Sequence, residues 1–210
     1  YKHLKYLMSN NLPSGAKVVV IGGGVAGCSV AYHLAKYGWN DVVLLERDQL
    51  TSGTTWHAAG LIGQLGASAT LTKIRNHSLN LYKELENETE LSSGLKQNGS
   101  LTVATTKGRL DELKRQVTTA QLFNVDAFEV SIEKIKEIYP LINVEDIVGG
   151  VFIARDGQAD PVGVANVLAK AARQNGAKII EKCPVKKILK KDNKIVGVET
   201  SKGKIECEYV

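Results

Sequence analysis

The sequence is poor in the residues that build disulfide frameworks and metal sites. Only three cysteines occur among its 210 residues, at Cys28, Cys183 and Cys207, and no pair has C-x-x-C spacing. None of the four histidines has the spacing of metal ligands. We therefore expect no metal centre. We interpret the cysteines as reduced, buried small residues, which suits a reducing compartment better than a secreted protein.

The chain also lacks a long apolar stretch. No run approaches the roughly 20 residues that a membrane-spanning helix needs, so we expect no membrane span. The first residues contain no apolar core of a secretory signal. The chain begins at Tyr1 rather than Met, so we expect an upstream segment that was removed, as a transit peptide is, or left out.

The charge pattern does not favour nucleic-acid binding. The net charge is +5, and the lysines are dispersed except in one group near the C-terminus: Lys186, Lys187, Lys190, Lys191 and Lys194. No aromatic residues are interleaved with this group, so we interpret it as the solvated face of strands and a turn. An apolar content of 43% over 210 residues is typical of a globular protein with one core or one and a half domains.

The segment from Lys17 to Leu61 carries the main functional signal. Residues 17–21 are a β-branched apolar run, which is typical of a buried parallel strand. Gly22, Gly24 and Gly27 follow in G-x-G-x-x-G order, and a helical pattern comes next. A second apolar run, residues 42–45, ends in Glu46, which lies 19 residues after Gly27. This order predicts a βαβ dinucleotide-binding unit.

Each of these residue types has a role in binding a dinucleotide. Gly22 permits a sharp turn after the strand, Gly24 lets a pyrophosphate approach the backbone, and Gly27 lets the helix lie close to the sheet. The N-terminus of the helix would face the phosphates, and Glu46 would accept hydrogen bonds from ribose hydroxyls. The alternative is a glycine-rich turn without a ligand, which would not require the flanking strand, helix and acid.

The rest of the chain alternates between helices and strands. After the βαβ unit we expect a long loop over residues 47–66, and then helices near residues 71–85, 110–120, 132–138 and 161–175. We expect strands near residues 101–104, 127–130 and 151–154, and four more from residue 178 to the end. Asp160 and Pro161 form an N-cap pair, and Pro140 ends a helix.

This layout predicts an α/β protein with a Rossmann-type FAD-binding fold into which an α+β substrate-binding portion is inserted. We expect a lead-in over residues 1–16 and the FAD-binding βαβ unit with its loop over residues 17–66. The inserted portion would cover residues 67–160, and the returning FAD-binding helix and strands residues 161–210. Because the chain stops within a predicted strand, we expect the fold to be truncated before it is complete.

The segment LTSGTTWHAAGL, residues 50–61, resembles the sarcosine dehydrogenase and dimethylglycine dehydrogenase family of FAD-dependent oxidoreductases. Further segments match in order along the chain: KQNGSL, RLDELKR, YPLINVEDI and DGQADP. The TSGTTWH and QNGSL forms favour sarcosine dehydrogenase over its dimethylglycine relative. The resemblance implies an FAD cofactor that is bonded covalently, through its 8α carbon, to the histidine of the TWH motif, which is His57 here. His57 is therefore the residue expected to carry the catalytic flavin.

The resemblance also implies the other contacts to FAD. Besides Gly22, Gly24 and Gly27, the matching positions are Val25, Ala26, Glu46, Arg47, Gly53, Thr54, Thr55, Trp56, His57, Ala58, Ala59, Gly60, Leu61 and Val185. Val185 corresponds to the position whose backbone pairs with the adenine, although an apolar strand residue would also be ordinary there. Trp56 could equally be a packing residue beside the flavin.

The implied reaction is the oxidative demethylation of sarcosine, N-methylglycine, by transfer of a hydride from the N-methyl carbon to flavin N5. The implied partners are the small-molecule substrate and an electron-acceptor flavoprotein, and tetrahydrofolate could accept the released carbon in the full-length parent. The expected compartment is the mitochondrial matrix, or the cytoplasm in a bacterium. Substrate-clamping residues, an Arg or a Tyr, would lie in the missing C-terminal part, so this fragment alone should be inactive.

Dimethylglycine dehydrogenase remains an alternative to sarcosine dehydrogenase, because the two are close relatives, and two further alternatives remain open. One is a non-catalytic relative with the same fold, such as the pyruvate dehydrogenase phosphatase regulatory subunit. The intact TWH motif argues against it, because a protein without a redox role needs no flavin-bonding histidine. The other is a binding or assembly module that uses the nucleotide fold without FAD. The intact glycine turn and Glu46 argue against that alternative.

Overall fold

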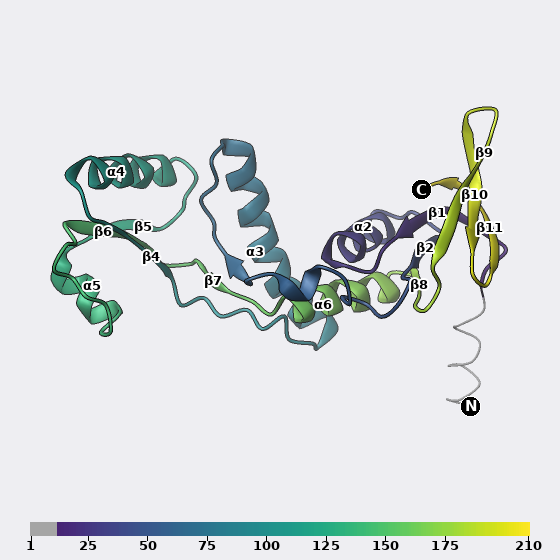
Figure 1. Ribbon diagram of the computed structural model, residues 1–210, viewed down its shortest axis with the longest axis horizontal. Helices are drawn as coiled ribbons and strands as arrows, with labels where there is room; N and C mark the ends of the chain where they lie inside the picture. The colour runs from purple at the N-terminus through teal and green to yellow at the C-terminus, as the bar shows by residue number, and fades with distance from the viewer. Residues whose placement is uncertain (1–11) are drawn as a thin grey trace. The chain divides into compact units, whose positions relative to one another are not determined.

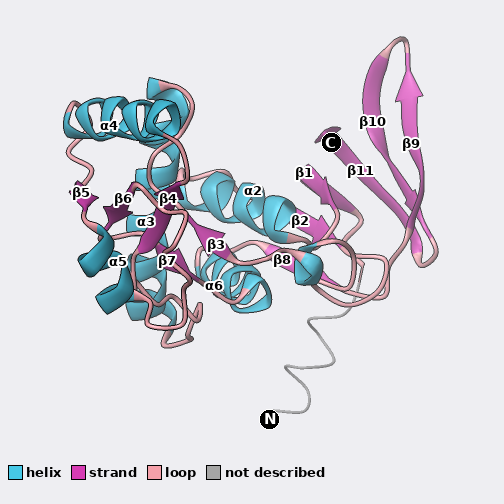
Figure 2. Cartoon of the chain, turned by 60° about the vertical axis from the view of Figure 1, so that its left-hand side comes forward, coloured by secondary structure: helices cyan, strands magenta, loops and turns pink. Residues whose placement is uncertain are grey.

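A computed structural model describes residues 12–210, which form two compact units. The first unit comprises residues 12–59, 84–93 and 160–210, and the second comprises residues 60–83 and 94–159. Most of the predicted lead-in, residues 1–11, lies outside the described residues. Figure 1 traces the elements along the chain, and Figure 2 distinguishes helices from strands.

A six-stranded sheet forms the frame of the first unit. Its strands are β1 (Gly15–Ile21), β2 (Val42–Leu45), β8 (Lys178–Ile180), β9 (Val185–Lys191), β10 (Lys194–Thr200) and β11 (Gly203–Tyr209), in the order β8-β2-β1-β11-β10-β9. β8, β2, β1 and β11 are parallel, whereas β9, β10 and β11 pair antiparallel. The strand near residue 178 therefore returns to the sheet beside β2, which confirms the predicted Rossmann-type α/β fold with an insertion.

Two helices of the first unit pack against each other, α2 (Val25–Lys36) and α6 (Pro161–Gln174). The Asp160 side chain caps α6 by accepting from the N–H groups of Val162 and Gly163, both at 3.1 Å, as the Asp-Pro pair predicted. Gly38 has φ +84° and follows Tyr37, the C-cap of α2, so it occupies the C′ position, where glycine is favoured. The buried core of the sheet includes Val19, Val43, Leu45, Ile180, Val198 and Ile205.

The second unit contains two small sheets, two whole helices and part of a third helix. β3 (Leu61–Ile62) pairs antiparallel with β7 (Gly157–Gln158), and β6 (Gly149–Ile153) lies between β4 (Ser100–Ala104) and β5 (Ala127–Val130). Its helices are α4 (Lys107–Gln121), α5 (Ile132–Ile138) and the first part of α3 (Ala69–Thr89). None of the helices within residues 12–210 combines the length and apolar character needed to cross a bilayer.

The unit boundaries differ from the predicted domain limits in two places. Residues 60–66 belong to the second unit because β3 pairs with β7, and not to the βαβ portion. Residues 84–93 belong to the first unit, where the Lys170 side chain donates to the Thr89 carbonyl and the Asp160 N–H donates to the Ser93 carbonyl. Both exchanges depend on pairing between distant segments, which local sequence patterns do not reveal.

Candidate functional site: a glycine turn tied to the TWH loop

The glycine-rich turn leaves β1 and enters α2 within three residues. Gly22 has φ +108° and donates its N–H to the Leu45 carbonyl at 2.8 Å. A Cβ on Gly27 would lie 1.9 Å from the Gly22 carbonyl oxygen, so no larger residue fits where the helix crosses the turn. Gly24 is the N-cap of α2, and a Cβ there would lie 2.9 Å from the Thr55 hydroxyl oxygen. Thr55 belongs to the TWH loop, which is the segment after Glu46 that contains Thr55, Trp56 and His57. This loop therefore leaves no room for a side chain at Gly24, in addition to the expected approach of a phosphate.

The first amides of α2 are suited to an anion. The first hydrogen bond within the helix is from the Cys28 N–H to the Gly24 carbonyl at 2.9 Å. The N–H groups of Ala26 and Gly27 precede it and have no carbonyl partner inside the helix. Together with the positive end of the helix dipole, they form the kind of site that binds phosphate.

Glu46 lies at the end of β2, and its carboxylate is held in place by backbone amides. It is 8% exposed. Its Oε2 accepts from the Gly23 N–H at 2.6 Å, and its Oε1 accepts from the Asp48 N–H at 2.9 Å. Each carboxylate oxygen can accept a further hydrogen bond. The side chain is therefore oriented, and its two oxygens can receive two hydroxyl donors such as those of a ribose.

The loop after Glu46 is bonded to the glycine turn along its length. The Thr51 N–H donates to the Gly23 carbonyl at 3.0 Å. Thr55, which is 8% exposed, accepts from the Val25 N–H at 3.0 Å through its hydroxyl oxygen. Residues 55–57 form a short 3-10 helix, η1 (Thr55–His57), which packs against α6. Thr55 therefore joins the first amide of α2 to the segment that ends in His57.

Trp56 and His57 are exposed on η1. Their ring centroids are 3.7 Å apart with an interplanar angle of 50°, so the indole constrains one side of the imidazole. The His57 N–H donates to the Thr54 carbonyl at 3.1 Å, which fixes its backbone within the turn. The imidazole is thus positioned by its backbone and by one aromatic neighbour.

A cleft of about 440 Å³ brings many of the predicted residues together. Its lining consists of Ile21, Gly22, Gly24, Leu45, Glu46, Arg47, Gly53, Thr54, Thr55, Pro184 and Val185. Predicted positions that do not line it are Val25, Ala26 and Gly27 at the start of α2, and Trp56, His57, Ala58 and Ala59 in and after η1. Gly60 and Leu61 belong to the second unit.

The sequence reasoning missed three lining residues of this cleft. Ile21 and Leu45 end the two adjacent parallel strands β1 and β2, and Pro184 directly precedes β9. The rule that ligands bind beyond the carboxyl ends of parallel strands could have identified Ile21 and Leu45. Pro184 is brought to the cleft by the return of the chain after β8, for which no local signal exists.

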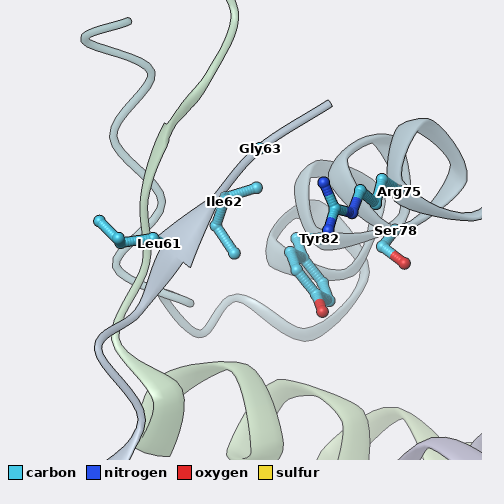
Figure 3. A pocket seen from close by; sticks show the side chains of 6 residues that line it. All are labelled: Leu61, Ile62, Gly63, Arg75, Ser78 and Tyr82. Atoms are coloured by element: carbon cyan, nitrogen blue, oxygen red, sulfur yellow. The ribbon is translucent and has the colours of Figure 1, made fainter. Parts of the chain in front are cut away.

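A second pocket, of about 420 Å³, lies in the second unit. It is lined by Leu61, Ile62, Gly63, Arg75, Ser78 and Tyr82. Figure 3 shows the side chains of Arg75, Ser78 and Tyr82 on one helix, α3, and Ile62 reaching toward that helix from β3. Leu61 extends in the opposite direction and is 80% exposed. The sequence analysis named only Leu61 among these six residues.

Comparison with protein families and curated proteins finds related sequences along nearly the whole chain. The family described as DAO, FAD dependent oxidoreductase, matches residues 17–210. Mitochondrial sarcosine dehydrogenase of Homo sapiens is 45% identical over 208 residues, which covers 96% of this chain and 23% of that protein. Mitochondrial dimethylglycine dehydrogenase of Rattus norvegicus is 40% identical, covering 93% of this chain and 23% of that protein.

A protein with a different printed role is similarly related. The mitochondrial pyruvate dehydrogenase phosphatase regulatory subunit of Mus musculus is 41% identical, covering 94% of this chain and 23% of that protein. The chain thus spans about a quarter of the length of these curated relatives. Among solved structures, L-proline dehydrogenase from P. horikoshii matches with a TM-score of 0.87 and 31% identity, covering 95% of this chain and 53% of that one.

Proposed function

The chain belongs to the family of FAD-dependent oxidoreductases, and from that premise we propose that it is the flavin-binding part of an amine dehydrogenase that demethylates sarcosine. The family match and the similarity to sarcosine and dimethylglycine dehydrogenases confirm the predicted resemblance. One observation carries the proposal: Gly22, Gly24, Glu46 and Thr55 line one cleft, and the Thr55–Val25 hydrogen bond joins the segment that ends in His57 to the start of α2.

The residues of the cleft, together with the start of α2 that follows Gly24, fit FAD. The N–H groups of Ala26 and Gly27 would hold the diphosphate, since the helix does not use them. Glu46 would accept the ribose hydroxyls through the remaining lone pairs of its two oriented oxygens. Arg47 and Val185 line the same cleft and would contact the adenine side. When bound, FAD supplies a two-electron acceptor for the hydride of the N-methyl carbon.

His57 is the proposed point of covalent attachment to the flavin. Its imidazole is exposed and would bond through one ring nitrogen to the 8α carbon of the flavin. The backbone of η1 and the Trp56 ring restrict where that imidazole can lie. The attachment would keep the flavin on the protein under conditions that unfold it.

The finer features of the proposal concern the whole protein. They are sarcosine as the substrate, an electron-acceptor flavoprotein as the oxidant of the reduced flavin, and tetrahydrofolate as a possible acceptor of the one-carbon unit. The mitochondrial matrix is the proposed compartment for a eukaryotic source, since the similar mammalian proteins are named as mitochondrial, and the cytoplasm is proposed for a bacterial one. Dimethylglycine is the alternative substrate.

Acid denaturation of the purified protein tests the flavin attachment. Fluorescent flavin should remain with the precipitated protein, and His57→Ala should release it into the supernatant while FAD still binds before denaturation. His77→Ala, which changes an exposed histidine of α3, is the matched control and should retain the flavin. Flavin that is free in the wild-type supernatant would disprove the His57 bond, and absence of any flavin would refute the FAD proposal.

Turnover by the full-length parent then separates the alternatives, since this fragment alone is expected to be inactive. Faster reduction of the flavin by sarcosine than by dimethylglycine supports the proposed substrate, and the reverse order supports the dimethylglycine dehydrogenase alternative. A protein that holds flavin but is reduced by neither amine would favour a non-catalytic role. The similarity to the pyruvate dehydrogenase phosphatase regulatory subunit is the observation that supports a non-catalytic role as the second candidate function.

A further inference from the structure

The pocket of the second unit contains a cation that has no acidic partner. Arg75 lies on α3 and donates through Nη1 to the Leu65 carbonyl at 2.5 Å. Among the described residues Arg75 forms no ion pair, and none of the six residues that line the pocket is acidic. A guanidinium has five N–H donors, so the bond to Leu65 leaves most of them for a ligand. The bond to Leu65 also restricts where the Arg75 side chain can lie.

Tyr82 supplies a second donor on the same face of α3. Arg75, Ser78 and Tyr82 are spaced by three and four residues, which places their side chains along one side of a helix, as Figure 3 shows. The Tyr82 hydroxyl forms no hydrogen bond with another described residue, and burial raises the pKa of Tyr82 above its ordinary value. The phenol therefore keeps its proton and can donate it. The Ser78 hydroxyl donates to the Ile74 carbonyl at 3.0 Å and is already used.

The opposite wall of the pocket is apolar or backbone. Ile62 extends from β3 toward α3, and Gly63 presents no side chain. The carboxylate of Asp156 lies behind Gly63, 3.7 Å from where a Cβ would be. The Asp156 carboxylate accepts from the Gln64 N–H and from the Ser100 hydroxyl, both at 2.7 Å. These two groups therefore occupy one acceptor site on each of its oxygens. An anion with a short apolar body matches this combination of two donors and an apolar wall.

We propose that this pocket binds the carboxylate of a small amino acid, with Arg75 pairing the carboxylate, Tyr82 donating a hydrogen bond to it and Ile62 contacting the carbon chain. Arginine is suited to this role because its planar donors match the two oxygens of a carboxylate. The family resemblance placed the substrate-clamping residues beyond residue 210, whereas Arg75 and Tyr82 lie within the chain. The identification of the anion as an amino acid rests on the proposed function, whereas the presence of an anion site does not.

Ligand-observed NMR with the purified protein tests the site. Methoxyacetate has the shape of N-methylglycine with oxygen in place of the amine, so it should bind without being oxidised. Arg75→Gln should weaken its binding about tenfold or more, and Tyr82→Phe about threefold to tenfold, as expected for lost charge-assisted and neutral hydrogen bonds. Arg75→Lys should recover part of the affinity because it restores the charge but not the planar fork.

Two controls make the outcome specific. Arg109→Gln removes an exposed arginine of α4 in the same unit, where it pairs with Glu112, and should leave methoxyacetate binding unchanged. Dimethylamine, which lacks a carboxylate, should bind equally weakly to wild type and Arg75→Gln. Circular dichroism melting curves show whether each variant is folded. Unchanged methoxyacetate affinity in a folded Arg75→Gln variant would overturn the site.

The ligand class is tested separately from the flavin proposal. Tighter binding of methoxyacetate than of acetate supports an amino-acid ligand, and equal binding of the two overturns that identification. A protein without flavin whose methoxyacetate binding still depends on Arg75 would disprove the proposed function but retain the anion site. A flavin-bearing protein whose methoxyacetate binding is unchanged by Arg75→Gln would disprove the anion site and leave the proposed function standing.

Discussion

Replacing Thr55 by valine should loosen the TWH loop from the glycine turn. Valine has nearly the same shape as threonine, so the change removes the hydroxyl oxygen that accepts from the Val25 N–H at 3.0 Å and little else. The bond is partly buried, and the Thr55 side chain is 8% exposed. A lost hydrogen bond together with an unsatisfied amide costs about 1–2 kcal/mol. The midpoint of thermal unfolding should fall by roughly 2–8 °C for a chain of this length.

The same change should slow attachment of the flavin. A cost of about 1–2 kcal/mol shifts the equilibrium between a docked and an undocked loop by about 5–30-fold. Because His57 lies two residues after Thr55 in η1, the undocked loop would carry the imidazole away from its bonding position. The assay is a time course of acid-stable flavin fluorescence after FAD is added to the apoprotein.

Two matched variants decide whether the hydroxyl is responsible. Thr54→Val changes the exposed neighbour, whose side chain has no hydrogen bond among the described residues, and should leave the unfolding midpoint unchanged. Thr55→Ser retains an acceptor and should attach flavin at nearly the wild-type rate. The reasoning is refuted if Thr55→Val melts and attaches flavin as wild type does, or if Thr54→Val lowers the midpoint as much.

Three further changes have defined outcomes. Gly27→Ala places a Cβ 1.9 Å from the Gly22 carbonyl oxygen and should lower the free energy of unfolding by about 1–3 kcal/mol or more, measured in urea. Glu46→Gln replaces an oxygen that accepts from the Gly23 N–H by an amide donor, and should weaken FAD binding at least about tenfold in a fluorescence titration. Burial raises the pKa of the Cys28 thiol to about 11, so Cys28 should resist alkylation at pH 8 until the protein unfolds.

The raised pKa of the Cys28 thiol also determines the direction in which stability changes with pH. Because the folded chain keeps the Cys28 proton to higher pH than the unfolded chain does, this contribution to stability should decline as pH rises above about 9, toward 11. Cys28→Ala should reduce that decline. Gly108→Ala serves as a control for Gly27→Ala, since Gly108 lies in the first turn of α4 and a Cβ there has no neighbour within 4 Å.

Strong local patterns explain which parts of the fold were predictable. The strand over residues 42–45 has the predicted bounds because four consecutive apolar residues, two of them β-branched, suit a strand that is buried on both faces. The helices over residues 107–121 and 132–138 followed from their periodicity and from Pro140. The turn of Asp192 and Asn193 has positive φ at both residues, as these residue types favour between two strands.

The parts that were not predicted depend on contacts between distant segments. Residues 84–93 join the first unit through bonds to the region of α6, more than 60 residues later in the chain. Thr55 was assigned to the cofactor because of its motif, whereas the structure also makes it an acceptor for the first amide of α2. Arg75 and Tyr82 carried no motif at all, since their common pocket forms only when β3 lies beside α3.

The order of residues therefore specifies the glycine turn, the acid that follows β2 and the TWH segment, because each needs its residue types at short, defined spacings. The sequence could not reveal that Thr55 bonds to Val25, that Pro184 completes the cleft, or that Arg75 forms no ion pair with any described residue. Those facts arise from hydrogen bonds and packing between segments that meet only after the chain has folded, and no local spacing encodes them.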